Sequence, residues 1–171
     1  AGEASVEAAG AVFTALLAGG DRVGIAAMGP RDCWLPPGAG TDHAVRGRET
    51  LATDPALAPT PSDDRFYRTL WRRRFRRRLP GDAQVLFFTP LVDDVPVDAA
   101  RRLDAYGHLV TVLSPDPTAS PSRSTTPGRR LAAIERRERI RTLRGAGIRV
   151  VEWGDRSFPA AVASASGRWS R

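Results

Sequence analysis

Two adjacent carboxylates, Asp93 and Asp94, follow a short uncharged segment, Val85–Thr89. The segment is apolar, is bounded by turn residues and by Pro90, and has the length of a strand buried on both faces. Parallel sheets bind ligands at the carboxyl ends of their strands, so such a pair could act as general acid and base or bind a hard cation. Neighbouring loop residues point in different directions, however, and we therefore favour a helix cap over a catalytic pair.

Other side chains that could do chemistry form weaker patterns. Asp32, Asp116 and Asp155 also follow expected strands, but carboxylates in this position commonly cap helices. The two histidines lack metal-ligand spacing, Cys33 has no evident base, and no Gly-x-Ser-x-Gly sequence is present. The segment Pro37–Thr41 lacks the lysine and the third glycine of phosphate-binding loops. We therefore expect a protein without enzymatic activity and without a cofactor.

A second candidate site is the basic run Arg65–Arg78, in which eight arginines alternate with aromatic residues and no acidic residue occurs. The run predicts either a surface for nucleic acid or anionic lipid, or a helix that packs its aromatic residues inward while arginines cover the outside. We favour the second interpretation. A second basic helix, Arg129–Arg144, contains Glu135 and Glu138 and is expected to be a solvated face. The residues expected to bind a partner are Arg72, Arg73, Arg76, Arg77, Thr89, Asp93 and Asp94.

Composition limits how far the arginines can be interpreted. All 26 basic residues are arginine, and they exceed the 19 acidic residues to give a net charge of +7. This charge permits binding to nucleic acid or to an anionic membrane. The absence of lysine, with frequent Ala, Gly and Pro, is typical of a GC-rich genome, which weakens the argument that arginine was selected for phosphate. No apolar run approaches the roughly 18 residues that span a bilayer.

The remaining pattern predicts alternating helices and strands, and hence an α/β fold with a mostly parallel sheet and helices on both faces. We expect residues 1–171 to form a single domain, with a flexible Pro/Ser/Thr loop at 115–127. Asp42 is expected to cap one helix, and Ser62 or Asp63 the next. Expected helices are Ala4–Ala18, Ala44–Thr53, a segment ending at Arg78, Val97–Ala105, Thr126–Arg144 and Ser157–Ser166. Expected strands are Val23–Met28, Cys33–Pro36 at an edge, Val85–Thr89, Leu109–Leu113 and Ile148–Glu152.

The order of several segments carries a family resemblance that spans about Val6 to Val162. These segments are GDRVGIAAMG, WLPPG, LPGDAQVLFFTPLVDD, YGHLVTVLSPD and GIRVVEW. Together they resemble the von Willebrand factor A fold, which is Rossmann-like, in the version found in the membrane-associated family called domain of unknown function fifty-eight. The resemblance implies a longer protein that is anchored by upstream transmembrane helices and has this domain at the cytoplasmic face. It also implies a MoxR-type AAA ATPase as a partner.

The sequence departs from that family where a metal ion would bind. The family's first central strand ends in Asp-x-Ser-x-Ser, which holds Mg²⁺ at a metal-ion-dependent adhesion site, whereas this chain opens on the following helix. Pro90 stands where a further Asp is expected, and only Thr60, or alternatively Thr41, and Thr89 offer hydroxyls nearby. We therefore expect a degenerate site without metal, with Mg²⁺ possible only if the motif exists upstream.

The missing strand has a structural consequence. The chain is expected to be a fragment, in which Val23–Met28 and Val85–Thr89 either pair directly or flank a gap that another chain fills. The resulting functional hypothesis is a non-enzymatic protein-interaction module. Two alternatives stay open: a basic nucleic-acid-binding domain, and an uncharacterised Rossmann-like enzyme that uses the strand-end carboxylates.

Overall fold

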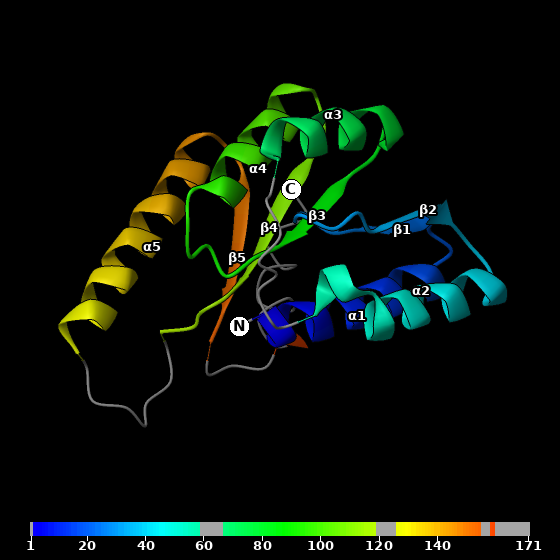
Figure 1. Cartoon of the computed structure of the whole chain (residues 1–171), viewed down its shortest axis with the longest axis horizontal. Helices are drawn as coiled ribbons and strands as arrows, with labels where there is room; N and C mark the ends of the chain where they lie inside the picture. The colour runs from blue at the N-terminus through cyan, green and yellow to red at the C-terminus, as the bar shows by residue number, and fades with distance from the viewer. Residues whose placement is uncertain (1, 59–66, 119–125, 155–157, 160–171) are drawn as a thin grey trace. The chain divides into compact units, whose positions relative to one another are not determined.

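The computed structural model describes residues 2–58, 67–118, 126–154 and 158–159. Helices and strands alternate through most of these ranges, as the sequence predicts for an α/β protein (Figure 1). The chain divides into two compact units, one formed by Gly2–Pro80 and the other by Gly81–Arg171. The finer expectation, a single von Willebrand A-type domain with helices on both faces of one sheet, stays a prediction.

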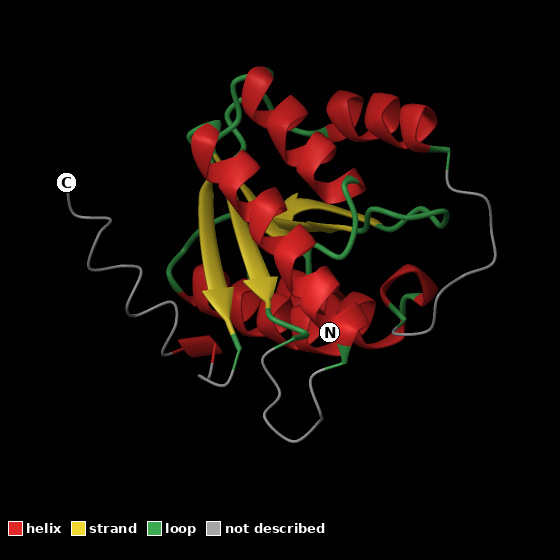
Figure 2. Cartoon of the chain, turned by 90° about the vertical axis from the view of Figure 1, so that its left-hand side faces the viewer, coloured by secondary structure: helices red, strands yellow, loops and turns green. Residues whose placement is uncertain are grey.

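The unit Gly81–Arg171 contains a three-stranded parallel sheet in the order β3-β4-β5, with one helix in each crossover (Figure 2). Its helices α4 and α5 pack against each other and against β4 and β5, so they share one face of the sheet. The predicted elements are confirmed here to within two residues. Their bounds are β3 (Val85–Phe88), α4 (Val95–Ala105), β4 (Val110–Pro115), α5 (Pro127–Gly145) and β5 (Arg149–Trp153).

Local sequence signals explain how α5 begins and ends. Thr126 accepts a hydrogen bond from the backbone N–H of Arg129, and Pro127 occupies the first turn, where its missing N–H costs nothing. At the other end, Gly147 has a φ of 82°, which only glycine adopts readily, and it turns the chain into β5. The helix then buries Ile140 and Leu143 with the apolar side chains of β4 and β5.

Strand β4 continues to Pro115, two residues past the expected end at Leu113. The backbone oxygens of Leu109 and Leu113 bond toward β3, so the nitrogen of Pro115 faces the same side. Strand β3 has already ended at Phe88, so it has no backbone carbonyl opposite Pro115 that needs an N–H donor. The missing N–H of Pro115 is therefore tolerated at this position. The extension brings Ser114 and Asp116 to the carboxyl edge of the sheet.

The unit Gly2–Pro80 combines a β-hairpin with helices. Strands β1 (Val23–Ala26) and β2 (Trp34–Gly38) pair antiparallel, with an irregularity between Val23 and Ile25. Residues 27–33 are too few for the crossover that a parallel pair requires. The other elements are α1 (Gly2–Ala18), α2 (Thr41–Thr53), the short 3₁₀ helix η1 (Pro55–Leu57) and α3 (Arg68–Arg78).

Two expectations for this unit are wrong. Strand β1 belongs to a two-stranded sheet with β2, so the direct pairing of Val23–Met28 with Val85–Thr89 is wrong, whereas the alternative of a gap filled by another chain stays a prediction. Asp42 does not cap α2, because the helix begins at Thr41, three residues before the expected start at Ala44, and its cap is Gly40 with a φ of 88°. Asp42 lies in the first turn instead, where its charge complements the helix dipole.

Some expectations fall on residues outside the described ranges. These are the helix over Ser157–Ser166 apart from residues 158–159, residues 119–125 of the 115–127 loop, the cap at Ser62 or Asp63, and Asp155. The described part of the loop forms a turn in which Asp116 accepts hydrogen bonds from the backbone N–H and the hydroxyl of Thr118.

Helices α1 and α2 approach closely at a glycine. The ring of Phe13, which is 3% exposed, covers Gly47 and lies 6.0 Å from the ring of buried His43. A methyl group at residue 47 would overlap the Phe13 ring. The absence of a side chain at Gly47 therefore sets how closely these two helices pack.

We predict that Gly47→Ala destabilises the protein by about 1–2 kcal/mol, because overpacking outweighs the gain in helix propensity of about 1 kcal/mol. Urea unfolding measures the change, and Phe13→Leu in the same chain should recover part of it. Gly128→Ala is the matched control, since a methyl group on that helical glycine meets no atom within 4 Å. Equal stability of the two single variants would contradict this packing.

Candidate functional site

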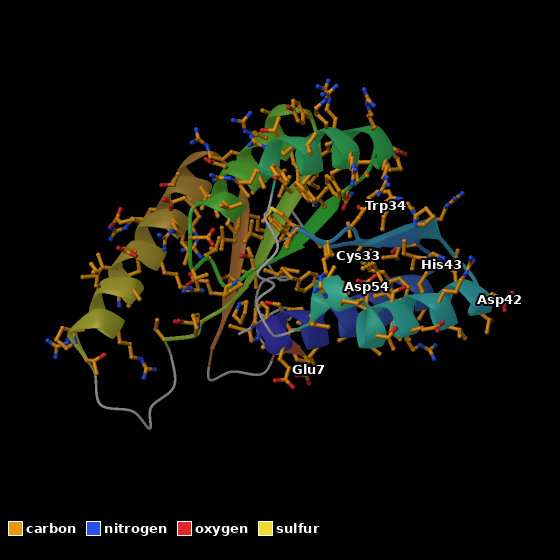
Figure 3. All side chains as sticks on the ribbon, viewed as in Figure 1. Glu7, Cys33, Trp34, Asp42, His43 and Asp54 are labelled. Carbon is orange, nitrogen blue, oxygen red and sulfur yellow. The ribbon has the colours of Figure 1, made fainter. Side chains whose placement is uncertain are left out.

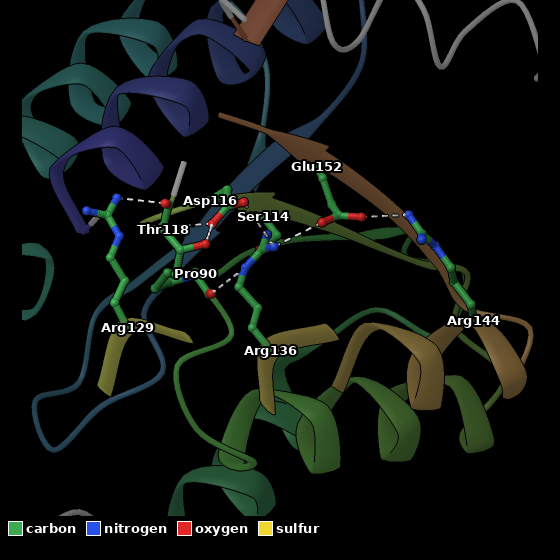
Figure 4. A network of polar contacts seen from close by, with 8 residues as sticks. All are labelled: Pro90, Ser114, Asp116, Thr118, Arg129, Arg136, Arg144 and Glu152. Atoms are coloured by element: carbon green, nitrogen blue, oxygen red, sulfur yellow. Dashed lines mark hydrogen bonds and ion pairs between the residues drawn. The ribbon is translucent and has the colours of Figure 1, made fainter. Parts of the chain in front are cut away.

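A buried arginine, Arg136, lies at the carboxyl edge of the parallel sheet (Figure 4). It is 4% exposed, and its guanidinium reaches oxygens at or just beyond the carboxyl ends of all three strands. Nε donates to the carbonyl oxygen of Pro90 at 3.3 Å, Nη2 to Ser114 Oγ at 2.9 Å, and Nη1 to Glu152 Oε2 at 2.9 Å. Nη1 also lies 3.7 Å from Asp116 Oδ2. The protein's own cation thus occupies the edge where a ligand of a parallel sheet would bind.

The helix α5 brings further arginines to the same edge. Arg129 Nη2 donates to the carbonyl oxygen of Thr118 at 2.7 Å, and Arg144 Nη2 donates to Glu152 Oε1 at 3.0 Å (Figure 4). These residues share a side of the helix with Arg136, since they lie seven and eight positions away. The expectation of a purely solvated face on Arg129–Arg144 is therefore wrong for this side. The outer side does carry Arg139–Glu135 and Arg141–Glu138 ion pairs.

The connection after β3 contains a strained residue. Leu91 has a φ of 55° and is fully buried, a combination that non-glycine residues rarely adopt. The buried hydroxyl of Thr89 accepts a hydrogen bond from the N–H of Leu91 at 3.2 Å. Arg136 holds the preceding carbonyl, and Arg139 Nη1 donates to the carbonyl oxygen of Leu91 at 3.4 Å. Arg136 and Arg139 of α5 therefore hold the turn at Pro90 and Leu91 in place. From the sequence, this segment was recognisable only as the end of a strand.

The carboxylates that opened the sequence analysis do not converge. Asp93 Oδ1 accepts from the backbone N–H of Val95 at 2.9 Å, which is a cap at the start of α4. Asp94 is 79% exposed and pairs with Arg139 Nε at 2.7 Å. Because the two side chains have separate partners, they have no shared proton or cation. The Asp93 contact satisfies the first backbone N–H of α4, but the cap residue Asp94 makes no side-chain capping hydrogen bond, so the helix-cap interpretation holds only for Asp93.

Asp116 is the carboxylate nearest the centre of the network. Burial raises its pKa as the largest single effect, but two hydrogen bonds from Thr118 and the charges of Arg136 and Arg129 together lower it further. The net pKa of Asp116 lies below its ordinary value of 3.8. Asp116 is therefore ionised at neutral pH and holds a charge that complements Arg136.

The residues of the expected metal site do not fit a hard cation. The hydroxyl of Thr89 is engaged with Leu91, the carbonyl of Pro90 with Arg136, and Thr60 lies outside the described residues. Hard cations need six or more oxygen ligands, and here a guanidinium already uses the strand-end oxygens. Within the described ranges, no three His, Cys, Asp or Glu side chains are grouped to hold a metal ion.

The second candidate surface, the helix α3, belongs to the other compact unit. Trp71 Nε1 donates to the carbonyl oxygen of Ala27 at 2.8 Å, Trp71 stacks on Phe75 at 4.9 Å, and Phe75 meets Trp34 edge-on at 5.8 Å. The aromatic side of α3 thus packs on the hairpin, as the favoured interpretation predicted. Of the expected partner-binding residues, Arg73, Arg76 and Arg77 are exposed, and Arg72 is half-buried.

Arg78 has a structural role that the sequence did not reveal. It lies on the aromatic side of α3, next to Phe75 and Trp34. Its Nη1 donates to both carboxylate oxygens of Asp32 at 3.0 Å, and its guanidinium lies 5.8 Å from the Trp34 ring centroid. Asp32 is therefore a partner of α3, and Arg78 helps to anchor the helix on β2.

The remaining titratable candidates are satisfied within the fold. Burial raises the pKa of the Cys33 thiol to about 12, and the hydrogen bond to Asp54 and the charges of Asp54 and Asp32 add to this shift (Figure 3). Such a thiol stays protonated and unreactive at neutral pH. His43 Nε2 lies 2.6 Å from the carbonyl oxygen of Val23, and His108 Nδ1 lies 3.1 Å from that of Ala83.

Comparisons of the chain with models of known protein families, with curated protein sequences and with solved structures find no match. No helix within the described ranges is long and apolar enough to cross a membrane. The geometry of the two units is therefore the basis for proposing a function.

We predict that Arg136→Met lowers the free energy of unfolding by about 3 kcal/mol, because it leaves Ser114, Asp116 and Glu152 without their buried cation. Glu152 retains Arg144, which places the loss at the lower end of the range for broken buried pairs. Arg137→Met, on the exposed side of the same helix, should change stability by less than about 0.5 kcal/mol. Urea unfolding of both variants provides the test. Similar decreases in the free energy of unfolding would show that the contacts of Arg136 contribute no more to stability than those of an exposed arginine.

The pKa of Asp116 gives a pH-dependent prediction. Since its folded pKa is lower than its unfolded pKa, Asp116 stabilises the protein above about pH 4, and this contribution is lost as pH falls through the folded value. Asp116→Asn should therefore be less stable than the wild type at pH 7, and the difference should shrink below pH 4. Urea midpoints at pH 7 and pH 3 measure this. A difference that is independent of pH would refute the assignment.

Proposed function

We propose that this chain is a non-enzymatic protein-interaction module of von Willebrand A-like architecture with a degenerate metal-ion-dependent adhesion site. The observation that supports this most strongly is the position of Arg136. Its guanidinium bonds to the carbonyl of Pro90 just after β3 and to the side chains of Ser114 and Glu152 in the last residues of β4 and β5, which are groups that a cation or a polar substrate at this edge would use. An edge filled in this way favours recognition of a surface over chemistry on a bound molecule.

The alternative of a Rossmann-like enzyme receives less support from the same carboxylates. A general acid or base works best with a pKa near neutrality, whereas the pKa of Asp116 is lowered. Glu152 is already engaged in ion pairs with Arg136 at 2.9 Å and with Arg144 at 3.0 Å. Asp93 and Asp94 are committed to a helix cap and to Arg139. None of these groups has the arrangement that proton transfer requires.

The proposed partner surface is the rim of the sheet edge around Val92. This side chain is 60% exposed between buried Leu91 and the exposed pair Asp93 and Asp94. An apolar residue surrounded by polar groups is the usual composition of an interface centre and its rim. The strained turn at Leu91 keeps Val92 in a fixed position, so binding would not need to order the loop.

The partner we propose is a MoxR-type AAA ATPase, with the domain at the cytoplasmic face of a membrane in a longer protein. This part of the proposal rests on the family resemblance of the segment order. The Arg-rich helix α3 would assist binding through its exposed Arg73, Arg76 and Arg77. The module would act without a cofactor.

We predict that Val92→Ser weakens binding to a purified MoxR-type ATPase from the same organism by about tenfold, as expected for an apolar residue at an interface centre. Biolayer interferometry with the immobilised domain measures the dissociation constants. The matched control is Leu109→Ser, since Leu109 is 64% exposed at the opposite end of the same sheet and should leave binding unchanged.

Two outcomes would count against the proposal. If the unmodified domain shows no binding, the ATPase is not its partner. If both serine variants bind as the wild type does, or lose affinity equally, the carboxyl edge is not the contact surface. Equal melting temperatures of the variants should accompany the comparison, because both side chains are solvent-exposed.

A further inference from the structure

The helix α3 presents an unusual concentration of positive charge. It contains seven arginines and no acidic residue, and none of its residues is buried. A genomic preference for arginine explains why lysine is absent, but it does not explain why acidic residues are excluded from one helix. In α5, by contrast, arginines pair with Glu135 and Glu138 along the helix. The excess of positive charge is therefore specific to α3 and does not follow from the arginine-rich composition of the whole chain.

The helix is held so that its charged side faces outward. Trp71 and Phe75 pack on the hairpin, and Arg78 is fixed by Asp32 and by the Trp34 ring. Arg73, Arg74 and Arg77 lie away from these contacts, are exposed, and form no ion pair within the described part of the chain. Because the anchoring side chains fix the helix, these three arginines form a preorganised cationic surface.

Exposed apolar side chains lie along one side of this surface. Tyr67 is 59% exposed and Leu70 is 51% exposed. With Arg74 and Arg77 they follow the spacing i, i+3, i+7 and i+10, which places all four on one side of the helix. Arginines beside an exposed aromatic ring are the combination that binds single-stranded nucleic acid, in which phosphates contact the cations and a base stacks on the ring.

We propose that α3 binds single-stranded nucleic acid, with Arg73, Arg74 and Arg77 contacting phosphates and Tyr67 stacking on a base. A membrane surface fits less well, since an interfacial helix must bury its apolar side in lipid and the aromatic residues of α3 are already engaged with the hairpin. Double-stranded DNA offers no unstacked base for Tyr67. This surface lies in the unit Gly2–Pro80, whereas the sheet edge described above lies in the unit Gly81–Arg171.

The test uses the full chain and a twenty-nucleotide oligothymidylate labelled with fluorescein, followed by fluorescence anisotropy between 50 and 200 mM salt. The variant Arg73→Gln/Arg74→Gln/Arg77→Gln should lose at least tenfold in affinity. The slope of log K against log salt should become shallower by about 2, since each phosphate contact on a single strand contributes about 0.7. The matched control, Arg130→Gln/Arg137→Gln/Arg141→Gln on α5, removes the same charge and should stay within twofold of the wild type.

Tyr67 tests the choice of a single strand. Tyr67→Ala should weaken oligothymidylate binding by about tenfold, and Tyr67→Phe, which keeps a ring, should restore it. A duplex of the same length should bind more weakly than the single strand and should not respond to Tyr67→Ala. If Tyr67→Ala binds the oligothymidylate as the wild type does, the stacking role is wrong.

Three further results would overturn the proposal. Equal losses in the α3 and α5 triple variants would show a response to net charge alone. Absence of oligothymidylate binding at 50 mM salt would remove nucleic acid as the ligand. Binding to phosphatidylserine vesicles without binding to oligothymidylate would assign the surface to a membrane. All substituted residues are exposed, so each variant should melt at the wild-type temperature.

Discussion

The buried guanidinium of Arg136 is the group on which the carboxyl edge of the parallel sheet depends. A charge removed from water is costly unless its hydrogen-bonding groups are satisfied, and here one planar cation donates to oxygens at the carboxyl ends of three neighbouring strands. The same contacts hold Pro90 beside the strained Leu91 and keep Glu152 on β5 oriented toward α5. The edge therefore behaves as one cooperative polar network, in which the position of each loop depends on the same side chain.

This arrangement is the physical basis for proposing that the sheet edge contacts a partner and does not carry out chemistry. The strand-end oxygens that would surround a metal ion or a substrate are occupied by an arginine from the neighbouring helix. The exposed features that remain are suited to contact with other molecules. At the sheet edge this feature is an exposed apolar residue followed by two carboxylates, and on α3 it is a cationic face beside an aromatic ring. The two surfaces differ in charge, so they would select different partners.

The periodic elements were predictable from the sequence because each carries local signals. Thr126 and Pro127 marked the start of α5, and the uncharged run Val85–Thr89 marked β3. The antiparallel hairpin was harder to predict from the sequence, since strands β1 and β2 are short. Only the short connection between them, residues 27–33, indicates antiparallel pairing. The inward position of Arg136 was missed for a physical reason. A chain whose basic residues are all arginine gives no contrast between an arginine chosen for burial and one that is merely solvated.

A retrospective signal for the site does exist. Arg136 lies four and seven positions before Ile140 and Leu143, so it shares the helical stripe that packs on the sheet. A charged residue within an apolar stripe predicts a buried partner, and Ser114 and Glu152 at the ends of β4 and β5 are suitable ones. Single-residue contacts such as Arg78 with Asp32 could not be inferred in this way, because they depend on how α3 lies on the hairpin.

The state of the Arg136 guanidinium can be measured directly by nuclear magnetic resonance. The Nε–H signal of Arg136 is identified in a ¹⁵N-labelled chain by its loss in Arg136→Lys, and its exchange with water is compared with that of exposed Arg130. A buried guanidinium bonded to strand-end oxygens predicts an Nε–H that exchanges at least about a hundredfold more slowly than that of Arg130, as local opening must precede exchange. Equal exchange rates would contradict the account, since they would show that Arg136 is solvated and that the sheet edge is open.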